Sequence, residues 1–357
     1  MENLIPVELI FHPSWWNKNC GISFEKEFFY DPKYRVESEL KMDKYLYERF
    51  GDLGLGRKEA ISRPVIGPVH IAAGFVISQL FGCKVKFHES SPPDVIARNL
   101  NDTEIMNLSA PNFKEAYPIN ELIKMMDILE EKFGYIEGDF NWSGIQNIAL
   151  DLRGQQLFID YFENPHIVKH LFDVISKTLV RFVKYITART GTSSLSVNPS
   201  VRNFKPSVNL HSNCSVTMIS AKTYEEYLLK YERYLSQNLQ PYGIHHCGNN
   251  MHRFAGSYAK VGGVCFYDVG WGSDVKECRK MLPDEFLNLR LSPVRILNCT
   301  PSEVEEDTIK LVADNGKMKN IGLCCINMDS DTPDENIRRI FNAVEYLKNN
   351  KTIKHVL

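Results

Sequence analysis

The sequence predicts an α/β protein built as a single TIM-type (β/α)8 barrel with an irregular, aromatic-rich N-terminal extension. Strands and helices alternate in four consecutive units in the last third of the chain, and similar alternation lies upstream, which is typical of parallel βαβ architecture. The length of 357 residues fits one large barrel with an appended segment. An open doubly wound sheet is the alternative, but it fits four consecutive units less well.

Residues 1–115 form the predicted extension, and residues 116–357 form the predicted barrel within one structural domain. The extension is rich in aromatic side chains, among them Trp15, Trp16 and Tyr30. We expect it to pack across the barrel as a lid rather than to contact substrate directly. Its 51–56 turn is glycine-rich, but it is a poor dinucleotide-binding loop because no clean strand precedes it.

Alternation begins near residue 117. Leu122, Met126 and Leu129 follow helical spacing, and Pro241 ends a Tyr- and Leu-rich helix. Up to this proline we predict helices over 120–133, 145–162, 165–190 and 224–239, with strands over 135–139 and 207–213.

The last third of the chain is the most regular. Ser302 with Glu305 three positions on has the pattern of a capping box, which predicts a helix start. In this region we predict strands over 243–247, 264–268, 287–296 and 320–326, and helices over 251–261, 274–281, 302–315 and 333–349.

Charge and hydropathy exclude two classes of partner. The chain has 42 basic and 44 acidic residues, so it lacks the basic surface that nucleic-acid binding requires. Its longest apolar run, residues 71–81, is too short to cross a membrane, and the N-terminus lacks the pattern of a secretory signal. We therefore expect a cytoplasmic protein.

Cysteine usage directs attention to metal binding. The chain has nine cysteines, and an odd number without an export signal argues against a disulfide framework. His245 and Cys247 lie two apart on a predicted strand, so both side chains point to one side. A thiol of the Cys324–Cys325 pair, at the end of the last strand, would complete a three-ligand zinc site with one open position. The alternative is a set of core cysteines beside a hydrogen-bonded histidine.

Several segments resemble the uroporphyrinogen decarboxylase superfamily, and most closely its corrinoid-linked methyltransferase branch, which includes methylcobamide:coenzyme M methyltransferases. The likeness covers most of the chain and is carried by Leu152-Arg153-Gly154, Phe162-Glu163-Asn164-Pro165, residues 213–220, His246-Cys247-Gly248-Asn249, residues 268–274, residues 331–333 and residues 335–337.

The resemblance implies a TIM barrel with a His-x-Cys…Cys zinc site. His245 and Cys247 match the first two ligands. Spacing from Cys247 favours Cys324 as the third ligand, whereas spacing back from Pro333 favours Cys325. Strand neighbours point to opposite faces, so only one of them should bind; we prefer Cys325 slightly.

The function implied by the resemblance is transfer of a methyl group between a corrinoid and a small thiol or methylated substrate. The corrinoid, a methylcobamide, would arrive on a partner protein or free, because the chain lacks an Asp-x-His-x-x-Gly corrinoid signature. Residues 13–19 lack the arginines that decarboxylases use to bind porphyrinogen carboxylates. A metal-free decarboxylase or lyase, and a non-catalytic subunit of a methyltransferase system, remain as alternatives.

Polar residues at the predicted strand ends are candidates for substrate binding. His211 and Asn213 lie two apart on one strand, so both could face the mouth of the barrel. Asp268 ends the strand after the metal strand, and Asn249 could orient a ligand by a hydrogen bond. Arg290 or Arg295, on the strand-like segment that follows, could bind a carboxylate or sulfonate. Each has a structural alternative, a loop cap or a buried hydrogen bond.

Overall fold

The structure is a computed structural model that describes residues 5–67, 74–138, 140–194 and 199–349. Six parallel strands form one curved sheet in the order β1-β10-β9-β8-β7-β6. A short parallel pair, β2-β5, and an antiparallel hairpin, β3-β4, stand apart from it. The strands are β1 (Val7–Phe11), β2 (Val65–Ile66), β3 (Lys84–Lys86), β4 (Asp94–Ile96), β5 (Glu137–Gly138), β6 (Asn209–Ser212), β7 (Tyr242–His246), β8 (Val264–Val269), β9 (Phe286–Arg290) and β10 (Ile321–Met328).

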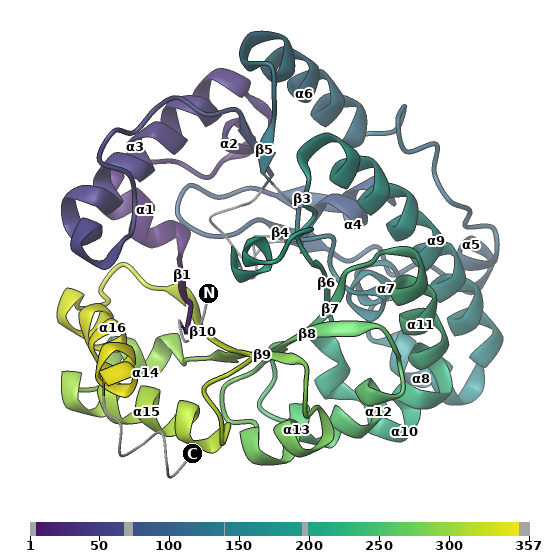
Figure 1. Cartoon of the computed structure of the whole chain (residues 1–357). Coiled ribbons are helices and arrows are strands. Elements are labelled where there is room, and N and C mark those ends of the chain that lie inside the picture. Colours follow the sequence, from purple (N-terminus) through teal and green to yellow (C-terminus); the bar gives the residue numbers. More distant parts are fainter. Residues whose placement is uncertain (1–4, 68–73, 139, 195–198, 350–357) are drawn as a thin grey trace.

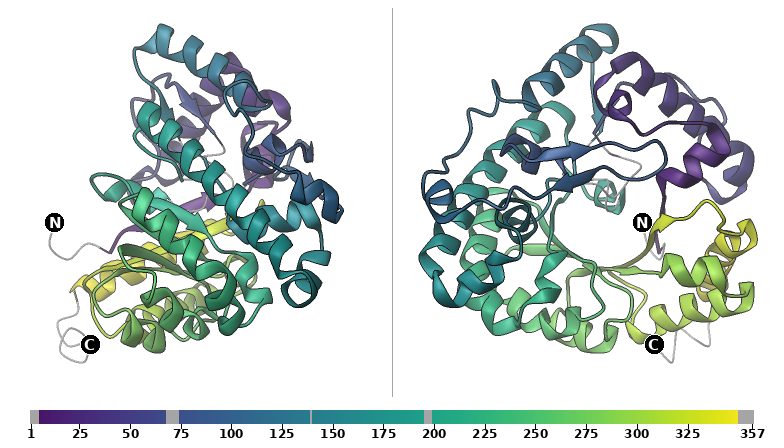
Figure 2. Two further views of the ribbon diagram at one scale, coloured as in Figure 1. Left: turned by 90° about the vertical axis from the view of Figure 1, so that its right-hand side faces the viewer. Right: turned by 180° about the vertical axis from the view of Figure 1, so that it is seen from behind.

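The curved sheet forms half of a barrel, and the predicted α/β class is confirmed to that extent. Among the described residues, the hydrogen-bonded strands form separate sheets of six and two rather than one closed ring of eight. Figure 1 shows the strands around a central space with the helices outside them. The reverse view in Figure 2 places the β3-β4 hairpin across one end of this ring.

The helices cover the outer side of the sheet, where the main apolar core lies. A smaller apolar layer, formed by Val201, Val208, Leu210 and Phe266, fills the inner side. The helices are α1 (Pro13–Cys20), α2 (Lys26–Tyr30), α3 (Pro32–Phe50), α4 (Val76–Leu80), α5 (Asp102–Met106), α6 (Ile119–Phe133), α7 (Ile145–Arg153), α8 (Gln156–Glu163), α9 (Pro165–Thr190), α10 (Ala221–Thr223), α11 (Leu229–Asn238), α12 (Ala255–Ala259), α13 (Val275–Met281), α14 (Pro293–Asn298), α15 (Pro301–Asp314) and α16 (Asp334–Asn349).

The first hundred residues are more regular than predicted. β1 pairs with the last strand, β10, so the segment that we expected to be an extension supplies a strand to the main sheet. α3 is a 19-residue helix capped by Asp31, whose side chain accepts a hydrogen bond from the Tyr34 amide. Trp15 and Trp16 are fully buried against each other and Phe11. Aromatic burial therefore holds this segment in the core.

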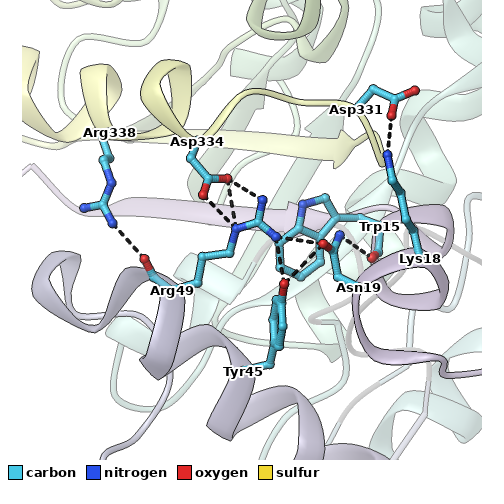
Figure 3. A network of polar contacts seen from close by, with 8 residues as sticks. All are labelled: Trp15, Lys18, Asn19, Tyr45, Arg49, Asp331, Asp334 and Arg338. Atoms are coloured by element: carbon cyan, nitrogen blue, oxygen red, sulfur yellow. Dashed lines mark hydrogen bonds and ion pairs between the residues drawn. The ribbon is translucent and has the colours of Figure 1, made fainter.

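Ion pairs and hydrogen bonds connect the N-terminal helices to the C-terminal helix α16 (Figure 3). The Arg49 guanidinium pairs with Asp334 at 2.7 Å and also bonds the side chains of Asn19 and Tyr45. Arg338 returns a hydrogen bond to the backbone carbonyl of Arg49. Two regions far apart in sequence thus meet at the β1-β10 seam.

Several predicted boundaries need correction. The predicted 145–162 helix divides at Gly154, which has φ +67° and ends α7. The predicted strand 287–296 stops at Arg290, because Pro293 begins α14. The cap of α15 is Thr300 with Glu303, two residues before the predicted Ser302. None of the helices in the described part of the chain combines the length and apolar character that a membrane crossing requires.

Candidate metal centre

The inner side of the curved sheet carries a layer of polar side chains. His245 of β7 stands in register with Asp268 of β8, and Asp268 with Asn288 of β9. All three are fully buried. Because successive strand residues alternate sides, the flanking Ile244 packs in the outer apolar core. The layer therefore belongs to the interior of the half-barrel.

His245 is held by a chain of hydrogen bonds. Its Nδ1 donates to Asp268 Oδ2 at 2.6 Å, and Asn288 Nδ2 donates to Asp268 Oδ1 at 2.8 Å. Burial lowers the pKa of His245, but the hydrogen bond and charge of Asp268 outweigh it and leave the pKa raised. Because Nδ1 of His245 donates to the Asp268 carboxylate, Nε2 is the ring nitrogen that can bind a metal.

Three donor atoms converge at the end of β7. One ligand atom each from Cys214, His245 and Cys247 lie within 4.8 Å of one another. Cys214 comes from the turn after β6, just before the 3-10 turn η3 (Ser215–Met218). One histidine and two cysteines are ligands that zinc prefers. Within the described residues, this is the group of His, Cys, Asp or Glu side chains that could hold a metal ion.

Two glycines allow the backbone to bring these donors together. A Cβ on Gly248 would lie 2.1 Å from Cγ2 of Thr217, so only glycine lets η3 approach the Cys247 segment this closely. A Cβ on Gly270 would lie 2.1 Å from the Gly248 carbonyl oxygen. Glycine is thus needed on both sides of the segment that presents Cys247.

The side chains of Cys214 and Cys247 shift each other's pKa in opposite directions. A hydrogen bond from Cys214 is the main reason that the pKa of Cys247 falls to about 3, with burial opposing and His245 and Arg290 assisting. The same hydrogen bond, together with burial, raises the pKa of Cys214. A thiolate beside a histidine nitrogen and a second thiol is a donor set that fits a divalent soft cation.

The predicted third ligands lie elsewhere. Cys325 packs in the outer apolar core, so its side chain faces the helices rather than the cluster. Cys324 points inward: it stands in register with Arg290, whose charge acts on it together with that of Asp268. Cys324 nevertheless does not belong to the cluster, whose third position is taken by Cys214. Sequence reasoning did not find Cys214, because it lies in a turn where strand alternation gives no direction.

His211 and Asn213 do not face the mouth of the barrel. His211 Nδ1 donates to Glu232 Oε1 of α11 at 2.8 Å, and its Nε2 accepts from the Ile145 amide at 3.1 Å. Asn213 Nδ2 donates to Glu232 Oε2 at 2.8 Å. Tyr242 also donates to this carboxylate, and these bonds lower the pKa of Glu232 despite its burial. His211 and Asn213 thus belong to a buried network on the helix side.

The remaining candidates take different places. Asp268 lies directly behind His245, as described above. Asn249 is exposed, and its Cβ lies near Gly272. His246 points outward and is held between Tyr258 and Asn250. Arg290, by contrast, is an inward-facing residue whose charge acts on both cysteines of the cluster.

A model of a known protein family matches most of the chain. The family model described as Uroporphyrinogen decarboxylase (URO-D) matches residues 69–347, which include every residue of the cluster. The chain belongs to the uroporphyrinogen decarboxylase family. No curated protein sequence matches the chain.

Solved structures extend the comparison of the URO-D fold. A methyltransferase from Methanosarcina mazei superposes with a TM-score of 0.65 at 13% identity, over 97% of this chain and 95% of that chain. A B12-independent methionine synthase from Shewanella sp. W3-18-1 superposes with a TM-score of 0.50 at 10% identity, over 97% of this chain and 96% of that chain. At these identities the likeness establishes the fold.

Proposed function

We propose that this URO-D family chain is a zinc-dependent methyltransferase, which moves a methyl group between a corrinoid and a small thiol or methylated substrate. The observation that carries the proposal is the convergence of Cys214, His245 and Cys247 within 4.8 Å. The proposed ligand set therefore replaces the thiol expected from Cys324 or Cys325 with that of Cys214. The fold shared with one protein described as a methyltransferase and one described as a B12-independent methionine synthase supports the reaction class.

The residues around the cluster suit thiol chemistry. Zinc, when bound, lowers the pKa of a coordinated thiol and so provides thiolate at neutral pH. Asp268 fixes the ring of His245 by the 2.6 Å bond to Nδ1, so that Nε2 faces the cysteines. Arg290 adds positive charge beside both thiols, which favours their deprotonated forms. Three protein ligands leave a fourth position for substrate.

The corrinoid is proposed as an exchangeable carrier rather than a permanent cofactor. The chain lacks an Asp-x-His-x-x-Gly corrinoid signature, so we propose that the methylcobamide arrives on a separate corrinoid protein or free. The second reactant is then a small molecule bound at the inner face of the half-barrel. We propose a cytoplasmic location for this system, where thiols stay reduced.

Metal content tests the ligand assignment. We expect about one zinc per chain in protein purified without chelator, and loss of zinc in Cys247→Ser and in Cys214→Ser. Cys324→Ser and Cys299→Ser are matched controls outside the cluster and should keep their zinc, as measured by mass spectrometry on folded protein. A zinc-free wild type, even after reconstitution under reducing conditions, would refute the zinc site.

Methyl transfer tests the reaction itself. Zinc-loaded protein, supplied with methylcobalamin and a panel of small thiols, should consume methylcobalamin, and the change is followed by its visible absorbance. Cys247→Ser should lose this activity, whereas Cys299→Ser should retain it. A zinc-loaded wild type that transfers no methyl group in either direction, with thiols or with methylated donors, would contradict the methyltransferase assignment while leaving the metal site intact.

A further inference from the structure

The turn that carries Cys214 is held by a side chain from outside the metal cluster. Asn147 lies on α7, and its amide bonds the backbone on both sides of Cys214. Its Nδ2 donates to the Ser212 carbonyl oxygen at 2.9 Å, and its Oδ1 accepts from the Ser215 amide at 2.9 Å. The Ser215 hydroxyl donates to the same oxygen. One side chain thus spans residues 212–215, with the candidate ligand Cys214 between its two contacts.

The partners of Asn147 fix the orientation of its amide. A backbone carbonyl can only accept and a backbone N–H can only donate, so the amide nitrogen faces Ser212 and the oxygen faces Ser215. The amide also bonds the Cys214 thiol. The hydrogen bond with Cys247 and burial raise the pKa of this thiol, and the hydrogen bond with Asn147 opposes them. An aspartate would lack the donor for Ser212, and an apolar side chain of the same size would lack both groups.

A glycine brings α7 close enough for these contacts. Gly144 precedes α7, and a Cβ at this position would lie 2.0 Å from the Ser212 carbonyl oxygen, so only glycine permits the approach. The next side chain of the helix adds a further bond: Gln146 Nε2 donates to the Ser215 carbonyl oxygen at 2.8 Å. Gln146 is itself held, because its Oε1 accepts from the Tyr161 hydroxyl at 2.7 Å. The start of α7 is therefore fixed against the turn.

A second anchor holds the residue before Cys214. The side chain of Asn213 donates to the Glu232 carboxylate of α11, and its backbone amide donates to the His245 carbonyl oxygen at 2.8 Å. Cys214 therefore lies between Asn213, which is tied to α11 and β7, and Ser215, which is tied to α7. Hydrogen-bond networks of this kind make a segment rigid, and a metal ligand needs such support to be held in the binding geometry.

We infer that Asn147 is a positioning residue, which holds Cys214 in place as the third ligand of the metal. Its role explains how a cysteine in a turn can complete a set whose other members lie at the end of a strand. The side chain that spans the turn gives it the rigidity that strand pairing gives to the segment of His245. This inference rests on the proposed function, because it takes the cluster to bind zinc. Asn147 acts through Cys214 and is assigned no contact with the metal.

Zinc affinity tests the role of Asn147. Asn147→Leu keeps about the size of the side chain and removes all its hydrogen bonds, at a position that is only partly buried. We expect zinc affinity, measured by chelator competition on folded protein, to fall by about 10- to 100-fold, as is typical when a group that supports a metal ligand is lost. Asn336→Leu is the matched control, since Asn336 is a buried asparagine that donates to the backbone carbonyls of Ile296 and Cys299, outside the cluster. Its zinc affinity should equal that of the wild type.

Cobalt(II) in place of zinc separates positioning from general support of the fold, because each thiolate bound to cobalt adds charge-transfer absorption. The absorption per bound cobalt in Asn147→Leu should fall from the wild-type value towards that of Cys214→Ser, whereas Asn336→Leu should keep the wild-type value. A merely structural role of Asn147 would lower the amount of folded protein without changing the absorption per bound cobalt.

The dependence on Cys214 is measured by combining the two substitutions. Cys214→Ser leaves His245 and Cys247 to bind metal weakly, and titration with excess cobalt measures this residual affinity. Adding Asn147→Leu to Cys214→Ser should lower it by less than about two-fold, because residues that act through one another are not additive. The same loss with and without Cys214 would mean that Asn147 supports the whole site, and this result would overturn the inference.

The inference would also fail if Asn147→Leu kept both the zinc affinity and the cobalt absorption of the wild type, because Cys214 would then need no support from α7. In that case the metal site itself would stand. A wild type that binds neither zinc nor cobalt would refute the proposed function instead, and the inference with it, so the two failures are distinguishable.

Discussion

The carboxylate of Asp268 controls how His245 can serve as a ligand. Asp268→Asn keeps the size of the side chain and an acceptor oxygen, but it removes the charge that orients and polarises the imidazole. We expect zinc affinity to fall by about 10- to 100-fold, a typical result for the loss of a carboxylate behind a metal-bound histidine. Chelator competition measures the affinity, and saturating zinc should still give the wild-type stoichiometry.

Asp151→Asn is the control for this substitution. Asp151 is also a largely buried carboxyl, held by a hydrogen bond from Ser78 and with a pKa raised by burial to about 6. It lies on α7, outside the cluster, so its substitution should leave zinc affinity unchanged. An Asp268→Asn protein that holds zinc as tightly as the wild type would show that Asp268 does not position the ligand.

Single residues were predictable from sequence where strand alternation applies. His245 and Cys247 lie near each other in the structure, as their spacing of two predicted. Alternation alone does not tell which residues of a strand face the inside of the barrel and which face the helices. The sequence left this open for β6 and β10, and His211 and Cys325 face the helices in the structure. The position of Cys214 depends on a turn and on the close approach allowed at Gly248, and neither leaves a periodic signal.

At the scale of elements, helix α15 offers a clean test of where a helix begins. The Thr300 side chain accepts from the Glu303 amide, and Glu303 accepts from the Thr300 amide. Thr300→Ala should therefore lower the free energy of unfolding by about 1 kcal/mol, within a range of about 0.5–2 kcal/mol. Ser302→Ala, at the position that the sequence pattern favoured, should change it by less than about 0.5 kcal/mol. Urea unfolding monitored by circular dichroism measures both.

The reverse order of these two effects would show that the helix begins at Ser302. The ambiguity is physical: Thr300 with Glu303 and Ser302 with Glu305 have the same capping-box spacing. Pro301 decides between them, because proline is favoured in the first helical position and cannot donate a hydrogen bond. The same kind of local signal, Pro293 at the start of α14, was overlooked when 287–296 was predicted as one strand.

At the scale of the whole molecule, the parallel α/β architecture could be predicted because each strand-helix unit leaves its own periodic pattern. The pairing of the first strand, β1, with the last strand, β10, could not be predicted from the sequence. β1 is only five residues long, and its partner β10 lies more than three hundred residues later. The Arg49–Asp334 ion pair is equally remote in sequence. Pairings of this kind depend on the packed whole, so an aromatic-rich beginning was mistaken for an irregular extension.

The β1-β10 seam also carries a partly buried acid, Glu8, that should make stability depend on pH. Burial raises the pKa of Glu8 on β1 from 4.5 to about 7, although Arg202 and Asn203 oppose the shift. The folded state thus binds the proton more tightly than the unfolded state, so the contribution of Glu8 to stability should be fully present below pH 4.5 and should be lost as the pH rises to 7. Glu8→Gln removes this dependence and should be more stable than the wild type at pH 8 by about 1–3 kcal/mol.

The comparison is made by urea unfolding at pH 5 and pH 8, because all other titrating groups are common to both proteins and cancel in the difference. The advantage of Glu8→Gln should be much smaller at pH 5 than at pH 8, and it should vanish below pH 4.5, where the Glu8 carboxyl is protonated in the folded and the unfolded state alike. Glu306→Gln, an exposed glutamate on α15, should show no such pH-dependent difference. A difference that is the same at both pH values would mean that Glu8 keeps an ordinary pKa, and that Arg202 and Asn203 fully compensate its burial at the seam.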